Sequence, residues 1–163
     1  MKESIQKVEI RLCYQIHEGF ELFSAEELAL FEAAREATRQ SYAPYSKFNV
    51  GAALLLSDGS ILKGSNQENA AYPSGLCAER VAMFYANSNF PNLAVRALAV
   101  TASKLGEFSL KPVPPCGSCR QVLLESESRF QTPIKIYLVG RDKVVVADSA
   151  KDLLPLNFDS QYL

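Results

Sequence analysis

The sequence has 163 residues, of which 48% are hydrophobic and 21% are charged, and its formal net charge is −1. This size and composition are typical of a soluble globular protein with a single core, and no apolar run approaches the roughly 20 residues that cross a bilayer. Nucleic-acid-binding proteins usually carry a basic excess, which is absent here. We therefore expect a small-molecule substrate, no nucleic-acid partner and no membrane association. Residues 1–12 lack the apolar core of a signal peptide, so we expect a cytoplasmic location.

Periodicity predicts the elements in chain order. Residues 8–16 alternate apolar and polar side chains, which predicts a strand that we cannot place in the fold. Ser24 followed by Glu27 predicts a capping box that opens a helix to about Gln40. The pattern downstream predicts strands at 49–56 and 60–63 joined by a turn at Asp58-Gly59, a helix at 77–87, a strand at 95–101, a loop at 103–115, a helix at 117–126 and strands at 134–139 and 144–147. Helices that alternate with strands predict an α/β sandwich with helices on both faces of the sheet.

Three of the four cysteines lie in two short motifs, Cys-Ala-Glu at 77–79 and Pro-Cys-Gly-Ser-Cys at 115–119. Each motif falls where a loop meets a predicted helix, and a helix N-terminus favours thiolates through its partial positive charge and free N–H groups. Cys116 and Cys119 are three residues apart and share one helix face. The motifs predict one catalytic zinc ion held by Cys77, Cys116 and Cys119, with a fourth position left for water.

The residues beside these cysteines suit the same chemistry. Zinc with three thiolates carries a net charge of about −1, which opposes the activation of water unless positive groups lie nearby. Arg80 is the favoured thiolate partner, and Arg120 is a second candidate. Glu79 can serve as a proton shuttle, although the dipole of a helix alone also favours an acid in its first turn. Zinc nucleobase deaminases as a class place a non-ligand glutamate beside the first ligand and combine it with a PCxxC motif.

Four stretches together resemble the cytidine deaminase family: Tyr45–Ala53, Asn66–Tyr72, Cys77–Arg80 and Pro115–Val122. The similarity runs from about residue 31 to residue 158. It implies a three-layer α/β/α sandwich with a five-stranded mixed core sheet, formed by one domain over 24–163 after an N-terminal extension over 1–23. It also implies one zinc ion per chain, and hydrolysis of cytidine and deoxycytidine to uridine and deoxyuridine with release of ammonia, a reaction of pyrimidine salvage.

The same resemblance implies roles for further residues. Glu79 moves protons between water, the pyrimidine ring and the leaving ammonia. Asn66 and Glu68 match the ribose-binding pair, and Phe48 matches an aromatic residue that packs on the pyrimidine. The branch with three cysteine ligands is homotetrameric, and three residues match positions that reach a neighbouring subunit's site: Ala70, Tyr72 and Phe158. A C-terminal segment that packs on its own core is an equal alternative for Phe158.

Other interpretations stay open at this stage. A related deaminase such as blasticidin deaminase has similar zinc motifs, but the Asn66–Asn69 segment argues for a nucleoside. A structural zinc site would need His17, the only histidine, as a fourth ligand; a surface histidine is the better expectation. A redox protein would explain the CxxC pair but not Cys77 or Glu79. Cys13 is expected to be a semi-buried thiol.

Overall fold

The computed structural model describes residues 5–163, and its first helix begins where the capping box predicts. Ser24 Oγ accepts a hydrogen bond from the Glu27 backbone N–H, and the Glu27 carboxylate accepts one from the Ser24 N–H at 2.8 Å. These bonds satisfy two of the free donors at the start of α1 (Ala25–Ala37). The helix closes in a turn of 3-10 helix at Thr38–Gln40, so the predicted end near residue 40 is confirmed.

Within residues 5–163 the sheet contains seven strands, two more than the five expected for the core sheet. The five expected strands are β2 (Phe48–Leu56), β3 (Ile61–Ser65), β4 (Val95–Lys104), β6 (Lys135–Val139) and β7 (Lys143–Ala147). The additional strands are β1 (Gln15–Glu18), which pairs with the edge of β7, and the two-residue β5 (Glu107–Phe108), which folds back on β4. The order is β1-β7-β6-β4-β2-β3, and among the strand pairs of residues 5–163 only β4–β6 is parallel.

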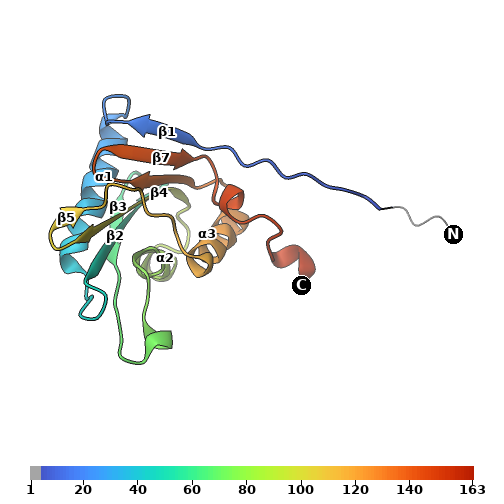
Figure 1. Cartoon of the computed structure of the whole chain (residues 1–163). Coiled ribbons are helices and arrows are strands. Elements are labelled where there is room, and N and C mark those ends of the chain that lie inside the picture. Colours follow the sequence, from blue (N-terminus) through green and yellow to red (C-terminus); the bar gives the residue numbers. More distant parts are fainter. Residues whose placement is uncertain (1–4) are drawn as a thin grey trace.

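Helices cover both faces of this sheet, which confirms the three-layer α/β/α class (Figure 1). α1 packs on one face around Phe31 and Tyr137, whose rings meet edge to face at 5.1 Å between centroids. α2 (Ala78–Asn89) and α3 (Gly117–Phe130) pack on the other face around Met83 and Leu123. α2 lies so close to β3 that a Cβ at Gly64 would come within 2.6 Å of the Ala78 carbonyl oxygen, so this contact requires glycine.

The N-terminal strand differs from its prediction in place and length. Strand pairing covers only residues 15–18, from Gln15 opposite Val146 to Glu18 opposite Lys143, whereas the alternation predicted residues 8–16. β7 ends one residue after Val146, so it does not extend far enough to pair with residues before Gln15. Residues 5–14 extend away from the body (Figure 1). Cys13 lies on this segment and is exposed, so the prediction of a semi-buried thiol is wrong.

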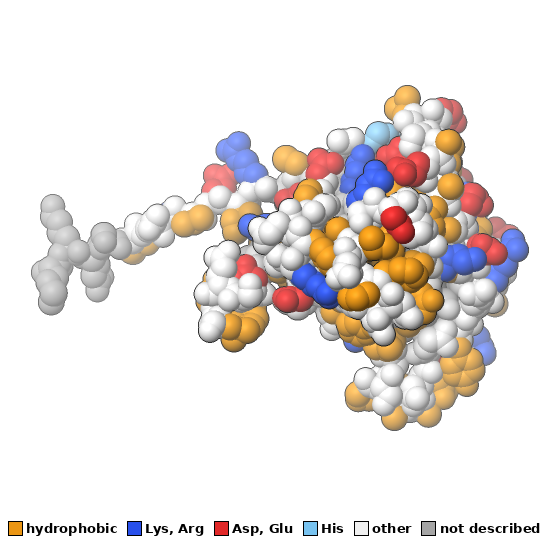
Figure 2. Space-filling view, turned by 180° about the vertical axis from the view of Figure 1, so that it is seen from behind, with side chains coloured by type: hydrophobic (Ala, Val, Ile, Leu, Met, Phe, Trp, Pro, Cys, Tyr) orange, Lys and Arg blue, Asp and Glu red, His pale blue; other side chains and the backbone are white. Residues whose placement is uncertain are grey.

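The surface mixes charges of both signs. On the face displayed in Figure 2, acidic and basic side chains lie close together and apolar side chains gather between them. Across residues 5–163, every helix is too short or too polar to cross a membrane.

Candidate active site

Two helix N-termini bring three cysteines to one place. Cys77 is the N-cap of α2, Cys116 is the N-cap of α3, and Cys119 lies buried in the first turn of α3. Their Sγ atoms all lie within 4.8 Å of one another, at 3.7 Å for Cys77–Cys116 and 3.4 Å for Cys116–Cys119. Three thiolates bound tetrahedrally to zinc at about 2.3 Å lie roughly 3.8 Å apart. The donor set and its spacing therefore fit a zinc ion.

The environment of the cluster favours a thiolate at Cys77. Hydrogen bonding with Cys119 lowers the pKa of Cys77 to about 5, and the Arg80 guanidinium, whose Nη2 lies 3.9 Å from the Cys77 Sγ, acts in the same direction. The same interaction with Cys77, together with burial, raises the pKa of Cys119. A deprotonated sulfur is the form that binds a metal. Arg80 therefore lies where a charge partner of the thiolate was expected.

Arg120 has a different role from the one considered for it. Its Nε donates to the Pro115 carbonyl at 2.9 Å, and its Nη1 donates to the Leu153 carbonyl at 2.8 Å. The guanidinium therefore ties the loop before α3 to the C-terminal segment, which fixes the approach of the chain to Cys116. His17 lies on β1 against the Phe23 ring, at 4.9 Å between centroids, and is outside the cysteine cluster. A fourth histidine ligand is thus excluded among the residues described.

Glu79 is the second residue of α2, and only 4% of its surface is exposed. Burial raises the pKa of its carboxyl above the usual value for glutamate, and the nearby Cys77 charge acts in the same direction. A carboxyl group with a raised pKa can both accept and release a proton closer to neutral pH. Its position beside the thiolates suits acid–base chemistry at a metal-bound ligand.

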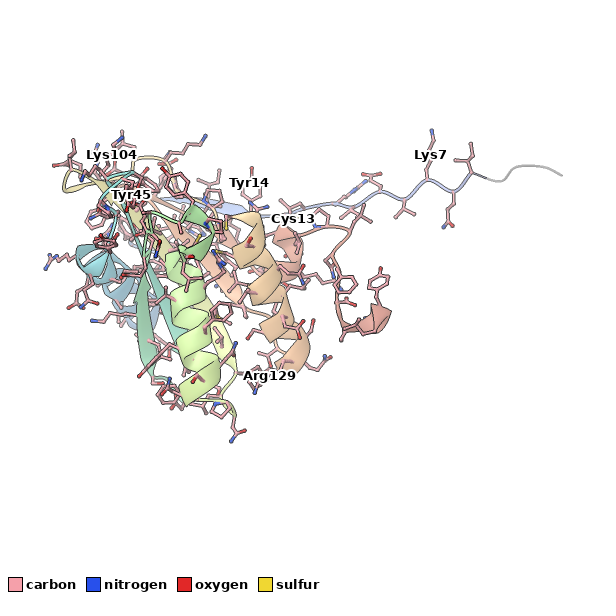
Figure 3. The ribbon with its side chains drawn as sticks, turned by 90° about the horizontal axis from the view of Figure 1, so that it is seen from below. Lys7, Cys13, Tyr14, Tyr45, Lys104 and Arg129 are labelled. Atoms are coloured by element: carbon pink, nitrogen blue, oxygen red, sulfur yellow. The ribbon has the colours of Figure 1, made fainter. Side chains whose placement is uncertain are left out.

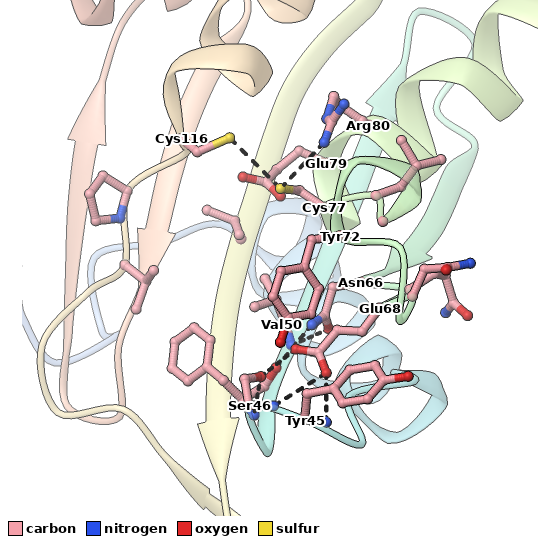
Figure 4. A pocket seen from close by; sticks show the side chains of 18 residues that line it. Tyr45, Ser46, Val50, Asn66, Glu68, Tyr72, Cys77, Glu79, Arg80 and Cys116 are labelled. Atoms are coloured by element: carbon pink, nitrogen blue, oxygen red, sulfur yellow. Dashed lines mark hydrogen bonds between the residues drawn. The ribbon is translucent and has the colours of Figure 1, made fainter.

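A cavity of about 750 Å³ lies in front of this cluster, within the size range of small-molecule sites. Figure 4 shows Cys77, Glu79 and Cys116 at one end of it and Asn66 and Glu68 at the other. The predicted residues that line the cavity are Phe48, Asn66, Glu68, Tyr72, Cys77, Glu79, Arg80 and Cys116.

Asn66 follows β3 and is held in a fixed orientation. Its Oδ1 accepts hydrogen bonds from the Val50 N–H at 2.8 Å and from the Ser41 hydroxyl, while its Nδ2 donates to the Phe48 carbonyl at 2.9 Å. A primary amide carries two N–H groups, so the second can still donate to a ligand. The contacts with Phe48 and Val50 brace the start of β2 at the same time.

Glu68 presents a fixed and ionised carboxylate to the cavity. The Ser46 hydroxyl donates to Oε1, and the Tyr45 N–H donates to Oε2 at 2.9 Å (Figure 4). The hydrogen bond from Ser46 is the main cause that lowers the pKa of Glu68. No role was predicted for Ser46 or Tyr45, although both open the first family-like stretch and that position was the available signal.

The three residues expected at a neighbouring site are all exposed in the single chain. Tyr72 is 78% exposed and lies at the cavity, edge to face with Tyr45 at 6.2 Å between ring centroids. Phe158 is 58% exposed and stacks on Tyr162. Within the part of the chain that is described, Ala70 and Phe158 lie outside the cavity lining. The chain thus brings Tyr72 to its own site, but not the other two.

Comparison with known proteins adds an independent finding. Residues 24–132 match the family model described as the cytidine and deoxycytidylate deaminase zinc-binding region. A cytidine deaminase of Halalkalibacterium halodurans is 41% identical over 132 residues, which is 81% of this chain and 93% of that protein. A cytidine deaminase of Sporosarcina psychrophila is 41% identical over 134 residues, covering 82% of this chain and 92% of that protein.

Solved structures agree with these sequence matches. The crystal structure of a cytidine deaminase from Burkholderia pseudomallei superposes with a TM-score of 0.68 at 41% identity, covering 80% of this chain and 98% of that chain. A cytidine deaminase from Mycobacterium tuberculosis gives a TM-score of 0.64 at 33% identity, covering 83% of this chain and 99% of that chain. By its motifs, its cysteine cluster and these matches, the chain belongs to the cytidine deaminase family of zinc-dependent hydrolases.

Proposed function

We propose that the protein hydrolyses cytidine and deoxycytidine to uridine and deoxyuridine with release of ammonia, as a step of pyrimidine salvage. The observation that carries the proposal is one cavity with the three cysteines and the buried Glu79 at one end and the fixed Glu68 carboxylate at the other. The first end suits hydrolysis of a ring amino group, and the second suits a sugar hydroxyl. A cytoplasmic location is part of the proposal, since a reducing compartment keeps three cysteines available as ligands.

At the first end, Cys77, Cys116 and Cys119 hold the zinc ion, which when bound lowers the pKa of water and makes it a nucleophile for C4 of the pyrimidine. Glu79 is not a ligand. Its carboxylate takes one proton from the attacking water and delivers it to ring N3. It then takes the second proton from the hydroxyl group now on C4 and passes it to the amino group, which leaves as ammonia while C4 becomes a carbonyl. Arg80 offsets the negative charge of the thiolates, and its 3.9 Å contact with Cys77 supports that role.

At the second end, the Glu68 carboxylate accepts a hydrogen bond from a ribose hydroxyl, and the remaining Asn66 N–H donates one. The bonds that hold both side chains in place support this assignment, because preorganised groups lose little entropy on binding. Phe48 packs against the pyrimidine between the two ends; its place in the cavity lining supports that contact.

The assembly in this proposal is a homotetramer, in which Ala70, Tyr72 and Phe158 contribute to neighbouring sites. The exposure of Tyr72 and Phe158 is compatible with this assembly, because both side chains are accessible to a neighbouring chain. Residues 24–163 form the catalytic domain in this scheme, and residues 1–23 are an appendage to it.

A substrate panel tests the function. Purified protein should release ammonia from cytidine and from deoxycytidine and act far more weakly on free cytosine and adenosine. Free cytosine leaves Glu68 and Asn66 without the sugar hydroxyls they are placed to bind, which should cost binding energy. Turnover of cytosine as efficient as that of cytidine would contradict the ribose roles, and inactivity toward all four compounds would contradict the function itself.

A further inference from the structure

The N-terminal arm, residues 5–14, is the largest feature that the deaminase chemistry leaves unused. It runs in an extended path away from the sheet, with Lys7, Cys13 and Tyr14 spread along it (Figure 3). Every second residue is apolar and exposed: Val8 at 77%, Ile10 at 57%, Leu12 at 46%, Tyr14 at 56% and Ile16 at 57%. Leaving such a row in water is unfavourable, so it calls for a partner surface.

The arm already has the two faces of a strand. The Arg11 Nε lies 3.1 Å from a Glu9 carboxylate oxygen, so these two charged residues share one face. The apolar row lies on the other face, because successive side chains of an extended chain alternate. In β1, Ile16 stands opposite Val145, which packs against the core under α2 and α3. The apolar row therefore continues the sheet face that those helices cover.

We propose that the arm pairs antiparallel with the arm of a second copy of this chain, about a two-fold axis at Leu12. The apolar row is symmetric about Leu12, so a reversed copy matches it residue for residue: Val8 faces Ile16, Ile10 faces Tyr14 and Leu12 faces itself. The outer edge of β1 is unpaired in the described chain, so the partner arm adds to a strand that already exists. The contact is isologous, as closed two-fold symmetry requires.

Charge and apolar matching together favour this register over an axis at Arg11 or at Ile10. With the axis at Leu12, the polar face sets Lys7 opposite His17 and Arg11 opposite Cys13, so no like-charged lysine or arginine residues face each other. A shift of the axis to Arg11 sets that arginine against itself, which is unfavourable. An axis at Ile10 gains exposed Glu9–Arg11 ion pairs, which contribute little, and replaces two of the apolar matches by Tyr14 against Gln6. Charge repulsion therefore disfavours the axis at Arg11, and the loss of apolar matches disfavours the axis at Ile10.

Cys13 offers a specific readout of this pairing. In the proposed register, the two Cys13 residues are diagonal neighbours at about 7–8 Å, within reach of a short bis-maleimide. The zinc-loaded wild-type chain should form covalent dimers with this reagent, and Cys13→Ser should not. Because the cross-link reports the arm alone, it is independent of other contacts in a tetramer.

Charge at the axis gives the decisive test. Leu12→Lys and Leu12→Glu should each reduce the cross-linked fraction about tenfold, since like charges then face each other. An equal mixture of the two variants should recover it, because lysine then faces glutamate. Val8→Lys and Val8→Glu are matched controls that face Ile16, so their mixture should not recover. Wild-type cross-linking by the single Leu12 variants, or no recovery in their mixture, would overturn the proposal; zinc content and circular dichroism should be unchanged throughout.

Discussion

Two carboxylates at opposite ends of one cavity have opposite environments. Burial raises the pKa of Glu79, whereas a hydrogen bond from Ser46 lowers the pKa of Glu68. Glu79 is therefore suited to carrying protons, and Glu68 to remaining a charged acceptor for a hydroxyl group. This division of work between two acids of the same type follows from their surroundings.

Replacing Glu79 should separate chemistry from metal binding. Glu79→Gln keeps the size and the hydrogen-bonding capacity of the side chain but cannot carry a proton, so we expect kcat for cytidine to fall by several orders of magnitude. Zinc content by elemental analysis and the melting temperature should stay near wild type. Near-normal turnover by this variant would contradict the acid–base role.

Two of the four cysteines provide a test variant and a matched control for metal binding. Cys116→Ala removes one of three clustered sulfur atoms and should markedly reduce zinc content, because two thiolates hold zinc more weakly than three. Cys13→Ala removes an exposed sulfur on the N-terminal arm and should leave the zinc content unchanged. Equal zinc content in both variants would contradict the assignment of the ligands.

Sequence patterns identified these residues because their signals are local. Cys77, Glu79 and the CxxC pair stand at helix starts, where residue type and spacing suffice to predict the chemistry. The partners of Glu68 are of another kind, because Ser46 and Tyr45 lie more than twenty positions away along the chain. Such contacts depend on how β2 and the loop after β3 meet, which no spacing rule contains.

At the scale of elements, a local sequence signal predicted a helix start correctly, whereas a strand signal did not predict the paired residues, because strand pairing depends on a distant partner. The capping box at Ser24 and Glu27 placed the start of α1 correctly. The alternation of residues 8–16 did not place β1, because a strand requires a partner and β7 reaches only residues 15–18. β5 is two residues long, which is too short for any period to be visible.

The capping box also gives a pH-dependent prediction. Partial burial acts to raise the pKa of Glu27, but hydrogen bonds from Tyr137 and from Ser24 outweigh it and lower that pKa. A carboxyl group with a lowered folded-state pKa stabilises the fold above its unfolded-state pKa and loses that contribution as the pH falls through the folded-state value. Glu27→Gln should therefore cost about 1 kcal/mol of unfolding free energy at pH 7.

Denaturant unfolding at several pH values measures this effect. The difference between Glu27→Gln and wild type should shrink as the pH falls below the usual range of a glutamate, since the wild-type carboxylate is then protonated. Glu26→Gln is the control, because Glu26 is about half exposed and its ion pair with Arg96 is long at 3.5 Å. A difference that stays constant with pH would show that the charge of Glu27 does not contribute.

At the scale of the whole molecule, the site in one chain is open where a nucleoside would need enclosure. Tyr72 is mostly in water at the cavity, and Phe158 lies away from it. Excluding water strengthens the electrostatic interactions of a reacting group, so an open cavity is poorly suited to hydrolysis at a single carbon. In the proposed tetramer, a neighbour's Phe158 closes the site.

Mixed assemblies test whether sites are shared between chains. Glu79→Gln chains lack the proton carrier, and Phe158→Ala chains lack the aromatic group given to a neighbour, so each pure sample should be impaired. In tetramers reassembled from an equal mixture, roughly a quarter of the sites combine an intact Glu79 from one chain with an intact Phe158 from another. The activity of the mixture should then exceed the mean activity of its two components.

A mixture of Glu79→Gln with Cys116→Ala should show no such gain, because both residues belong to the same chain's half of the site. Activity equal to the mean in the first mixture would mean that Phe158 serves its own chain, and the zinc chemistry would stand without a composite site.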